Sequence, residues 1–418
     1  MYDFDSYLLY EIKKRNVYSC KIKVSLTEAI DGDVLKAAAQ KAFRRFPYFA
    51  RKVRLNSEDA YILEPCEKPI TVSRENRVIR LGTEETNDLL FAITYEGSDI
   101  FFNFAHNFCG GCGAMRWLKA TLWQYLTDLG LEIDRSGIMT SNLPITDEEC
   151  AEPNPDSLPE TEPVGNFDFP GDAFVPRADY MELMKNPQGG IGYFPIIIPK
   201  KELMKYARDN DGSPNSILSA ALFKMAVKVF PDEERFMGRI ACNYREDVGC
   251  PETYRDMVRQ LKVPYDRRMS DWPIEKLSTM TRSRMYIQMQ PELSWAECRR
   301  VNAFRKAIDE QSDLESKADY AVKHSPTLSE GASTFFISYV GKVEWDGLAP
   351  YIKGVFSITN GHIMLEVNAT RDDFCISFQT VRRDDKYLKE FTEVLDEEGI
   401  SYRIGPLEDR NLPGIVLP

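Results

Sequence analysis

The same order of secondary-structure elements occurs in both halves of this chain, and this repetition limits the possible fold more than any other feature of the sequence. In the first half, residues 20–25 alternate in hydropathy as a strand does, and residues 31–46 carry apolar side chains at helical spacing. In the second half, a predicted strand at 193–198 leads into predicted helices at 200–208 and 215–229. Because the halves share this order without a short sequence repeat, the sequence predicts two related α/β lobes packed together.

Further short elements complete each predicted lobe. The first half adds predicted strands at 48–55, 61–63, 70–72 and 99–105 and a helix at 114–129. The second half adds predicted strands at 239–244, 334–343, 354–358, 364–369 and 374–380, an arginine-rich helical stretch at 254–306 and a closing helix at 384–398.

A proline-rich acidic segment separates the two halves. Residues 144–176 contain seven prolines and a cluster of acids with no lysine or arginine, a composition that does not pack a core of its own. We therefore predict an N-terminal lobe at 1–143, a crossover at 144–191 and a C-terminal lobe at 192–418. A site between two such lobes is a common place for a ligand.

Composition excludes several classes of partner. The chain has 65 acidic and 53 basic residues, so its net charge of -12 repels nucleic acid. The sequence contains no apolar run long enough to span a bilayer, and its first residues lack the order of a signal peptide, so we expect a cytoplasmic protein without a membrane partner. The nine cysteines are irregularly spaced, which favours reduced thiols over a disulfide framework.

His106 lies in a glycine-rich turn between the predicted strand 99–105 and the predicted helix 114–129. Such a turn can bring the backbone close to a ligand and direct its amides along the start of the helix. Histidine is the side chain best suited to proton transfer near neutral pH. Of the three histidines, His106 is therefore the candidate for chemistry.

The segment NFAHNFCGGCGAMRWLKATL resembles the active-site loop of the chloramphenicol-acetyltransferase-like and condensation-domain superfamily, whose signature is His, three residues, Asp, Gly. His106 matches the catalytic histidine and Gly111 matches the signature glycine. The aspartate position holds Gly110, and the preceding, often duplicated histidine is Ala105. The resemblance is therefore to a member with a degenerate HxxxD motif.

Other segments resemble the same superfamily, in the same order along nearly the whole chain. DGDVLKAAAQKAFRRFPYFARKVR resembles its first helix and following strand, and SPNSILSAALFKMAVKV resembles the helix that opens its second lobe. RIACNYR resembles a strand that ends in Asn-x-Arg, and FFISYVGKVEW resembles a strand common in bacterial alcohol acetyltransferase-like members. The resemblance implies the two-lobed fold of coenzyme A-dependent acyltransferases, an α+β fold with similar mixed-sheet lobes and an active-site channel between them.

The resemblance also implies an activity. It implies transfer of an acyl group from a coenzyme A or carrier-protein thioester to an alcohol or amine, with His106 as general base and with no metal or tightly bound cofactor. The implied partners are a small-molecule donor and acceptor, and an acyl carrier protein is a further candidate. Candidate channel residues are Gly110, Gly111, Asn243, Arg245 and Ser338, although an ordinary strand-end role suits the last three equally well.

The missing motif aspartate raises a structural question. The resemblance implies that this aspartate organises the loop through an ion pair with an arginine, so Gly110 removes an anchor more than a reactive group. A buried arginine without its carboxylate would cost stability. Two alternatives are open: another acid substitutes for the aspartate, or the arginine is exposed.

Three further readings remain open. The departures at Ala105 and Gly110 suit a non-catalytic binding or scaffold protein that keeps the fold. Cys109 and Cys112 offer a metal or redox site, but neither a complete zinc ligand set nor a thioredoxin-like context is evident, which favours packing thiols. A basic stretch is either a solvated helix face or a surface for the phosphates of coenzyme A or for an acidic carrier protein. It comprises Arg255, Arg259, Lys262, Arg267 and Arg268.

Overall fold

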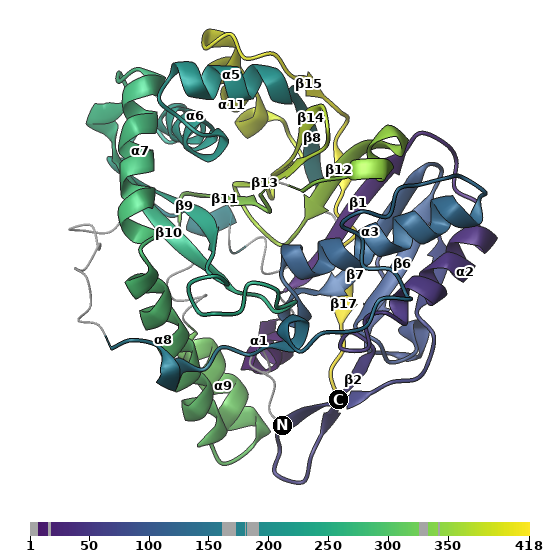
Figure 1. Ribbon diagram of the computed structural model, residues 1–418. Coiled ribbons are helices and arrows are strands. Elements are labelled where there is room, and N and C mark those ends of the chain that lie inside the picture. Colours follow the sequence, from purple (N-terminus) through teal and green to yellow (C-terminus); the bar gives the residue numbers. More distant parts are fainter. Residues whose placement is uncertain are drawn as a thin grey trace.

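Two mixed β-sheets organise the computed structural model (Figure 1), which describes residues 7–15, 18–160, 173–179, 181, 192–325, 333–341 and 343–418. The first sheet has the order β12 (Ile352–Ile358), β1 (Ser19–Leu26), β7 (Asp99–Ala105), β6 (Phe91–Glu96) and β4 (Thr71–Arg74). The second has the order β10 (Val258–Asp266), β9 (Arg235–Asn243), β11 (Phe335–Tyr339), β13 (Met364–Ala369), β14 (Asp373–Gln379), β8 (Gly192–Pro199) and β15 (Arg403–Ile404), and β16 (Glu408–Asp409) also pairs with β8. Two small ribbons join β2 (Arg51–Leu55) to β3 (Tyr61–Pro65), and β17 (Gly414–Ile415) to β5 (Arg80–Leu81).

Helices α2 (Gly32–Phe43) and α3 (Gly111–Asp128) lie side by side against the first sheet. Asp31 caps α2 by accepting hydrogen bonds from the amides of Asp33 and Val34. On α3, the buried Trp117 ring makes an edge contact with the Phe102 ring of β7, with centroids 5.0 Å apart. This packing fixes the position of α3, and therefore of the turn before it, relative to the end of β7.

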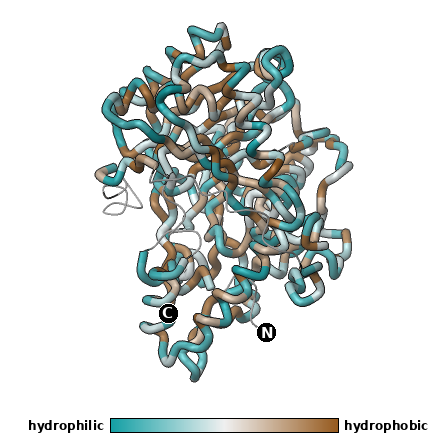
Figure 2. Tube along the Cα trace, turned by 90° about the vertical axis from the view of Figure 1, so that its left-hand side faces the viewer, coloured by the Kyte–Doolittle hydropathy of each residue, from teal (hydrophilic) through white to brown (hydrophobic). Residues whose placement is uncertain are grey.

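Around the second sheet, α6 (Pro214–Val229) packs between α7 (Ile274–Gln288) and α11 (Lys386–Glu397), with α5 (Lys200–Asp209) beside it. The helix α6 is apolar on most sides, which is typical of a helix surrounded by protein. It begins with a capping box of Ser213 and Ser216, with Pro214 as its first residue. Figure 2 shows hydrophobic residues concentrated along the inner segments and hydrophilic residues along the outer turns.

Segments from the second half of the chain complete the first lobe. The strand β12 pairs with β1 and so extends the first sheet, and the C-terminal strand β17 pairs with β5. The helices α8 (Pro291–Asp309) and α9 (Leu314–His324) form a group with α1 (Tyr7–Arg15). Residues between β9 and β10 also enter the core of the first lobe, where Tyr244, Tyr254 and Met257 are buried.

Most predicted elements are confirmed, and the strands 99–105 and 364–369 have the predicted bounds. The predicted helix over 254–306 is wrong for Val258–Asp266, which is the strand β10. Alternate residues of this strand are buried, including Leu261 and Val263, and Pro264 would interrupt a helix. The helix-face interpretation of the basic stretch is therefore wrong too. Arg259 is buried on this strand and donates to Ser294 Oγ at 3.2 Å.

The predicted crossover is partly described. Residues 144–160 contain two short 3₁₀ turns, Glu148–Cys150 and Pro155–Ser157, whereas 161–172 and 182–191 lie outside the described residues. Within the described ranges, no helix combines the length and the apolar character needed to cross a membrane.

Glu11 on α1 makes the stability of the fold depend on pH. Its carboxylate is fully buried and accepts a hydrogen bond from Tyr18 Oη at 2.7 Å, and burial raises its pKa to about 7 from an ordinary 4.5. The folded protein therefore holds this proton more tightly than the unfolded chain. The stability that the protonated carboxyl contributes is complete below the unfolded pKa and is lost as the pH rises through about 7.

We therefore expect the free energy of unfolding of Glu11→Gln to rise relative to that of wild type as the pH increases from 4.5 to 8. The difference between the two proteins should change by about 3 kcal/mol over this range. Urea denaturation of both proteins at several pH values measures this difference. A difference that stays constant with pH would contradict the prediction.

Candidate active site

His106 stands where the central strand β7 ends and the turn to α3 begins. The last residue of β7, Ala105, pairs with Ser19 of β1, and the His106 amide donates to the Tyr18 carbonyl at 2.7 Å. A single 3₁₀ turn, His106–Phe108, then leads to the start of α3 at Gly111. The imidazole is 29% exposed, so it is held by the fold and still reachable.

A carboxylate from the other half of the chain meets this histidine. Asp256, two residues before β10, places Oδ2 3.2 Å from His106 Nδ1, and its side chain is 19% exposed. In this arrangement Nδ1–H donates to the carboxylate, which leaves Nε2 as the nitrogen that accepts a proton. Asp256 could not be predicted from the sequence, because no local motif connects it to the glycine-rich turn.

The charges around His106 decide its pKa. Burial alone would lower this pKa, but the negative charge of Asp256, its hydrogen bond to the ring and the charge of Glu366 together raise it above the ordinary value. His106 is therefore a stronger base than a free histidine, held in one tautomer.

Glu366, on strand β13 of the second sheet, also influences His106 through its charge. It lies on β13 directly beside Ser338 of β11, is 4% exposed, and accepts hydrogen bonds from Ser338 and from Thr359 Oγ1, the latter at 3.0 Å. Burial raises its pKa to about 7, although these hydroxyls and His106 act in the opposite direction. The predicted residue Ser338 is thus connected to the histidine through a carboxylate that the sequence analysis did not identify.

Gly110, at the position of the motif aspartate, and the signature glycine Gly111 are closely covered by residues of the second half. A Cβ at Gly110 would lie 2.5 Å from Asp256 Oδ1 and 3.4 Å from Arg245 Nη2, while a Cβ at Gly111 would lie 3.0 Å from Val340 Cγ2. Gly110 has an ordinary extended backbone, with φ -74° and ψ 177°. What excludes a side chain at Gly110 is therefore the neighbouring carboxylate and not the conformation of the turn.

Arg245 is buried, with 2% exposure, and its guanidinium donates hydrogen bonds to backbone carbonyls and to a side-chain amide oxygen. Its Nε donates to the Thr253 carbonyl at 3.0 Å, its Nη1 donates to Asn243 Oδ1 at 2.9 Å, and its Nη2 donates to the Arg255 carbonyl. The predicted pair Asn243 and Arg245 thus lies together and organises the segment 243–256. Arg245 is thus not an exposed arginine, and backbone carbonyls together with Asn243 satisfy its guanidinium.

The segment that carries Asp256 is fastened to the first lobe. The Tyr254 amide donates to the Glu149 carbonyl at 3.0 Å, and the Tyr254 ring stacks on Tyr48 with centroids 4.2 Å apart. Thr253 Oγ1 donates to the Ala151 carbonyl at 2.8 Å. Asp256 therefore approaches His106 on a segment that is anchored both to the first lobe, at Tyr48, and to the crossover, at Glu149 and Ala151.

Glu149 in turn holds the crossover by a buried ion pair. Arg45 and Glu149 are each 3% exposed, with Nη2 2.5 Å from Oε1 and Nη1 3.1 Å from Oε2. Tyr48 Oη donates to the same carboxylate at 3.1 Å. Burial opposes the charge, but Arg45 and the other donors keep the pKa of Glu149 below its ordinary value.

The other histidines have different surroundings. The buried His362 accepts a hydrogen bond at Nδ1 from the Val381 amide at 3.2 Å, and its Nε2 lies 3.0 Å from Asp179 Oδ2. Both ring nitrogens are thus used by the protein itself. His324 is exposed on α9. His106 is the histidine whose contacts orient it and still leave a nitrogen for proton transfer.

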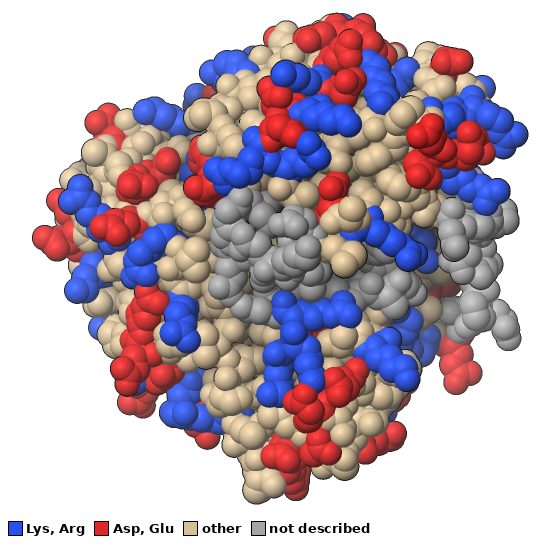
Figure 3. Space-filling view, turned by 180° about the vertical axis from the view of Figure 1, so that it is seen from behind, with Lys and Arg blue, Asp and Glu red and all other residues tan. Residues whose placement is uncertain are grey.

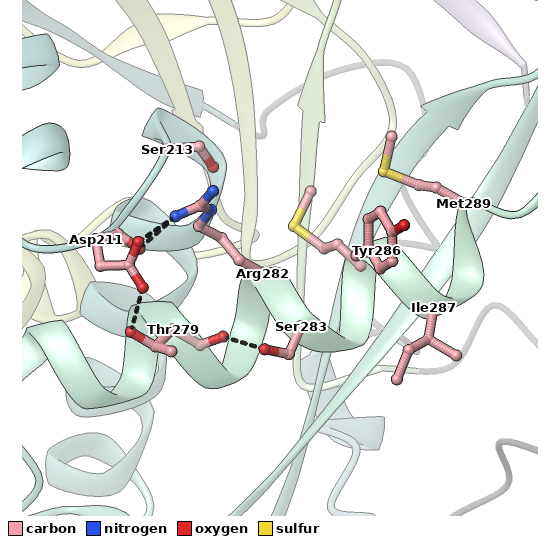
Figure 4. A pocket seen from close by; sticks show the side chains of 9 residues that line it. Asp211, Ser213, Thr279, Arg282, Ser283, Tyr286, Ile287 and Met289 are labelled. Carbon is pink, nitrogen blue, oxygen red and sulfur yellow. Dashed lines mark hydrogen bonds and ion pairs between the residues drawn. The ribbon is translucent and has the colours of Figure 1, made fainter.

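A separate hollow of about 620 Å³ lies along α7 and is shown in Figure 4. Asp211 accepts hydrogen bonds there from Arg282 Nη1 at 2.6 Å and from Thr279 Oγ1 at 3.1 Å. Tyr286 and Met289 lie near its other end and are 72% and 47% exposed. None of the predicted site residues lines this hollow.

The cysteine pair lies at the junction of the turn and α3, with Cys109 just before the helix and Cys112 in its first turn. Cys109 is buried and Cys112 is partly buried, and no group of three or more His, Cys, Asp or Glu in the described part of the chain has metal-site geometry. We expect the double substitution Cys109→Ser and Cys112→Ser to leave zinc content and far-ultraviolet circular dichroism unchanged. Elemental analysis of both proteins tests this, and loss of stoichiometric zinc on substitution would overturn it.

No protein-family model and no curated protein sequence matches this chain. Several solved structures resemble it over nearly its whole length. F. graminearum TRI101 complexed with coenzyme A and T-2 mycotoxin has a TM-score of 0.59 at 12% identity, covering 96% of this chain and 98% of that one. TRI3 trichothecene 15-O-acetyltransferase from Fusarium sporotrichioides has a TM-score of 0.57 at 12% identity, covering 95% and 93%. The first condensation domain of the CDA synthetase has a TM-score of 0.57 at 10% identity, covering 96% and 97%.

Proposed function

We propose that this chain, which has the two-lobed fold of these acetyltransferase and condensation-domain structures, transfers an acyl group from a thioester to an alcohol or amine. The donor is coenzyme A or a phosphopantetheine on a carrier protein, and His106 is the general base. The observation that carries the proposal is the contact of His106 Nδ1 with Asp256 at the end of β7. Fold similarity alone would not assign chemistry.

The reaction needs one proton acceptor at Nε2 of His106. As the acceptor oxygen or nitrogen attacks the thioester carbonyl, its proton passes to Nε2 and a tetrahedral intermediate forms. When the intermediate collapses, the carbon–sulfur bond breaks and the leaving thiolate takes the proton from His106. The products are an ester or amide and a free thiol, and no covalent bond to the enzyme is required.

The geometry around His106 suits this task. A base must present a free nitrogen in a fixed orientation, and the carboxylate at Nδ1 provides both the orientation and stabilisation of the imidazolium that forms. The raised pKa of His106 increases its affinity for the acceptor proton. Arg245 is buried beside Gly110 and is held by the exposed Asn243, which favours a role of this pair in shaping the site over direct chemistry.

A non-catalytic binding protein is the second candidate function. It is favoured by Ala105 and Gly110, where the signature motif would have histidine and aspartate. An acyl carrier protein remains a candidate partner for either function. On the face shown in Figure 3, basic and acidic side chains are interspersed, so complementarity to such an acidic partner would have to come from a local cluster.

The test is acyl transfer by the purified protein. Acetyl- and longer-chain coenzyme A thioesters, and the same acyl groups on a carrier-bound phosphopantetheine, are each combined with a panel of alcohols and amines. Release of free thiol and the mass of the acylated product are measured. Product formation with at least one pair supports the proposal. Binding of a thioester without product from any pair would favour the non-catalytic function.

A further inference from the structure

We infer that Asp256 supplies, from the second half of the chain, the carboxylate that the signature motif places at residue 110, and that it directs this carboxylate to His106. Asp256 is a positioning residue in this assignment, and its catalytic consequence rests on the proposed acyl transfer. The contact itself does not depend on that function. It rests on the space at Gly110, the partners of Arg245 and the groups that face His106.

The space at Gly110 is the first observation. The virtual Cβ position is only 2.5 Å from Asp256 Oδ1, so the beginning of an aspartate side chain at 110 and the carboxylate of Asp256 would occupy the same place. Since the backbone at Gly110 has a negative φ, the turn itself would accept any residue. The glycine at 110 therefore leaves free the space that the Asp256 carboxylate occupies.

The partners of Arg245 are the second observation. Its guanidinium lies 3.4 Å from the same virtual Cβ, next to the place of the missing side chain, yet it donates to carbonyls and to Asn243. Arg245 therefore stabilises the segment 243–256 from within. With the arginine satisfied in this way, the Asp256 carboxylate is available to contact His106 at 3.2 Å.

The groups that face His106 determine what Asp256 does. The negative groups are Asp256 before β10 and Glu366 on β13, and both also act on the buried thiol of Cys20 on β1, whose pKa lies above its ordinary value chiefly because of burial. Arg245 is the nearby positive group. Glu366 acts on His106 through its charge, whereas Asp256 also makes a hydrogen bond to the ring. Removing Asp256 therefore changes both the orientation and the basicity of the imidazole.

The first experiment measures the basicity of His106 without relying on activity. The chain has three histidines, so NMR titration of histidine-labelled protein resolves each one, and His106→Ala assigns the signal. In the isosteric variant Asp256→Asn, the titration of His106 is expected to move to lower pH while those of His324 and His362 stay in place. An unchanged His106 titration in a folded Asp256→Asn protein would overturn the inference.

The second experiment moves the carboxylate back to residue 110. Asp256→Ser is expected to lower kcat/KM roughly a hundredfold or more, because the base loses its orientation and tautomer. Gly110→Asp alone should also lower it, since two carboxylates would meet. The double variant Gly110→Asp with Asp256→Ser should recover at least tenfold over Asp256→Ser. Recovery no greater than in an unrelated double variant would contradict an exchange of positions.

The matched control is Glu252→Gln, which changes an acid of the same segment whose side chain is 59% exposed and pairs with Arg116. It should leave both the His106 titration and kcat/KM at wild-type values. If the wild type transfers no acyl group, the proposed function fails, but the titration still decides the role of Asp256. If transfer occurs and Asp256→Asn changes neither the titration nor the pH profile of kcat/KM, only the inference about Asp256 fails.

Discussion

Replacing His106 by alanine is expected to lower the turnover number by about a hundredfold to ten-thousandfold, which is the usual contribution of a positioned general base. The substitution removes the nitrogen that accepts the proton but leaves the surrounding turn and its amides in place. Substrate binding should therefore change far less than turnover. Steady-state rates for wild type and His106→Ala, with the most active donor and acceptor pair, measure the effect.

The matched control for this substitution is His324→Ala, since His324 is exposed on α9 and takes no part in the site. Its turnover should equal that of wild type. Equal rates for wild type and His106→Ala would remove His106 from the mechanism. No transfer by either protein, with thioester binding retained, would support the binding or scaffold function.

The second large effect is expected from Glu149→Ala, which should lower the free energy of unfolding by about 3–5 kcal/mol. This substitution leaves the guanidinium of Arg45 buried at 3% exposure without its carboxylate, and it also removes the acceptor for Tyr48 Oη. Denaturant unfolding at pH 7, where Glu149 is ionised in the wild type, gives the difference directly.

The control for the buried ion pair is the exposed ion pair of Lys205 and Asp209 on α5, whose side chains are 73% and 55% exposed. Asp209→Ala should cost no more than about 1 kcal/mol. The double variant Arg45→Met with Glu149→Leu should recover most of the loss, because it removes the unpaired charge together with its partner. Similar costs for Glu149→Ala and Asp209→Ala would show that burial of the ion pair has little energetic consequence.

Much of the fold could be predicted from local sequence, because strands and helices with one buried face carry a periodic pattern. The strands 99–105 and 364–369 show this most clearly. The strand β10 was missed because Arg259 lies on its buried face while the apolar Val258 lies on its exposed face, which obscures the period of two. The pairing of β12 with β1 could not be predicted, since pairing between distant strands leaves no local signal. The domain bounds at 143 and 191 remain a prediction.

The residues of the candidate site also differ in whether the sequence could predict them. His106 and the two glycines after it were recognisable, because the residues of a turn are neighbours in sequence. Asp256 and Glu366 were not, because the contact of Asp256 with His106 and the effect of the Glu366 charge on it arise only from the packing of distant segments. The question of what replaces the motif aspartate required the position of Gly110 relative to Asp256, which only the folded structure provides.

The origin of His106 and Asp256 in opposite halves of the chain has a consequence for splitting the protein. A fragment that ends in the crossover would contain the histidine without its carboxylate, and the complementary fragment would contain the carboxylate without the histidine. The basicity of one imidazole therefore reports whether the two parts have joined correctly. Fragments of this chain that reassemble in solution could be followed by that single titration, as a complementation assay that needs no substrate.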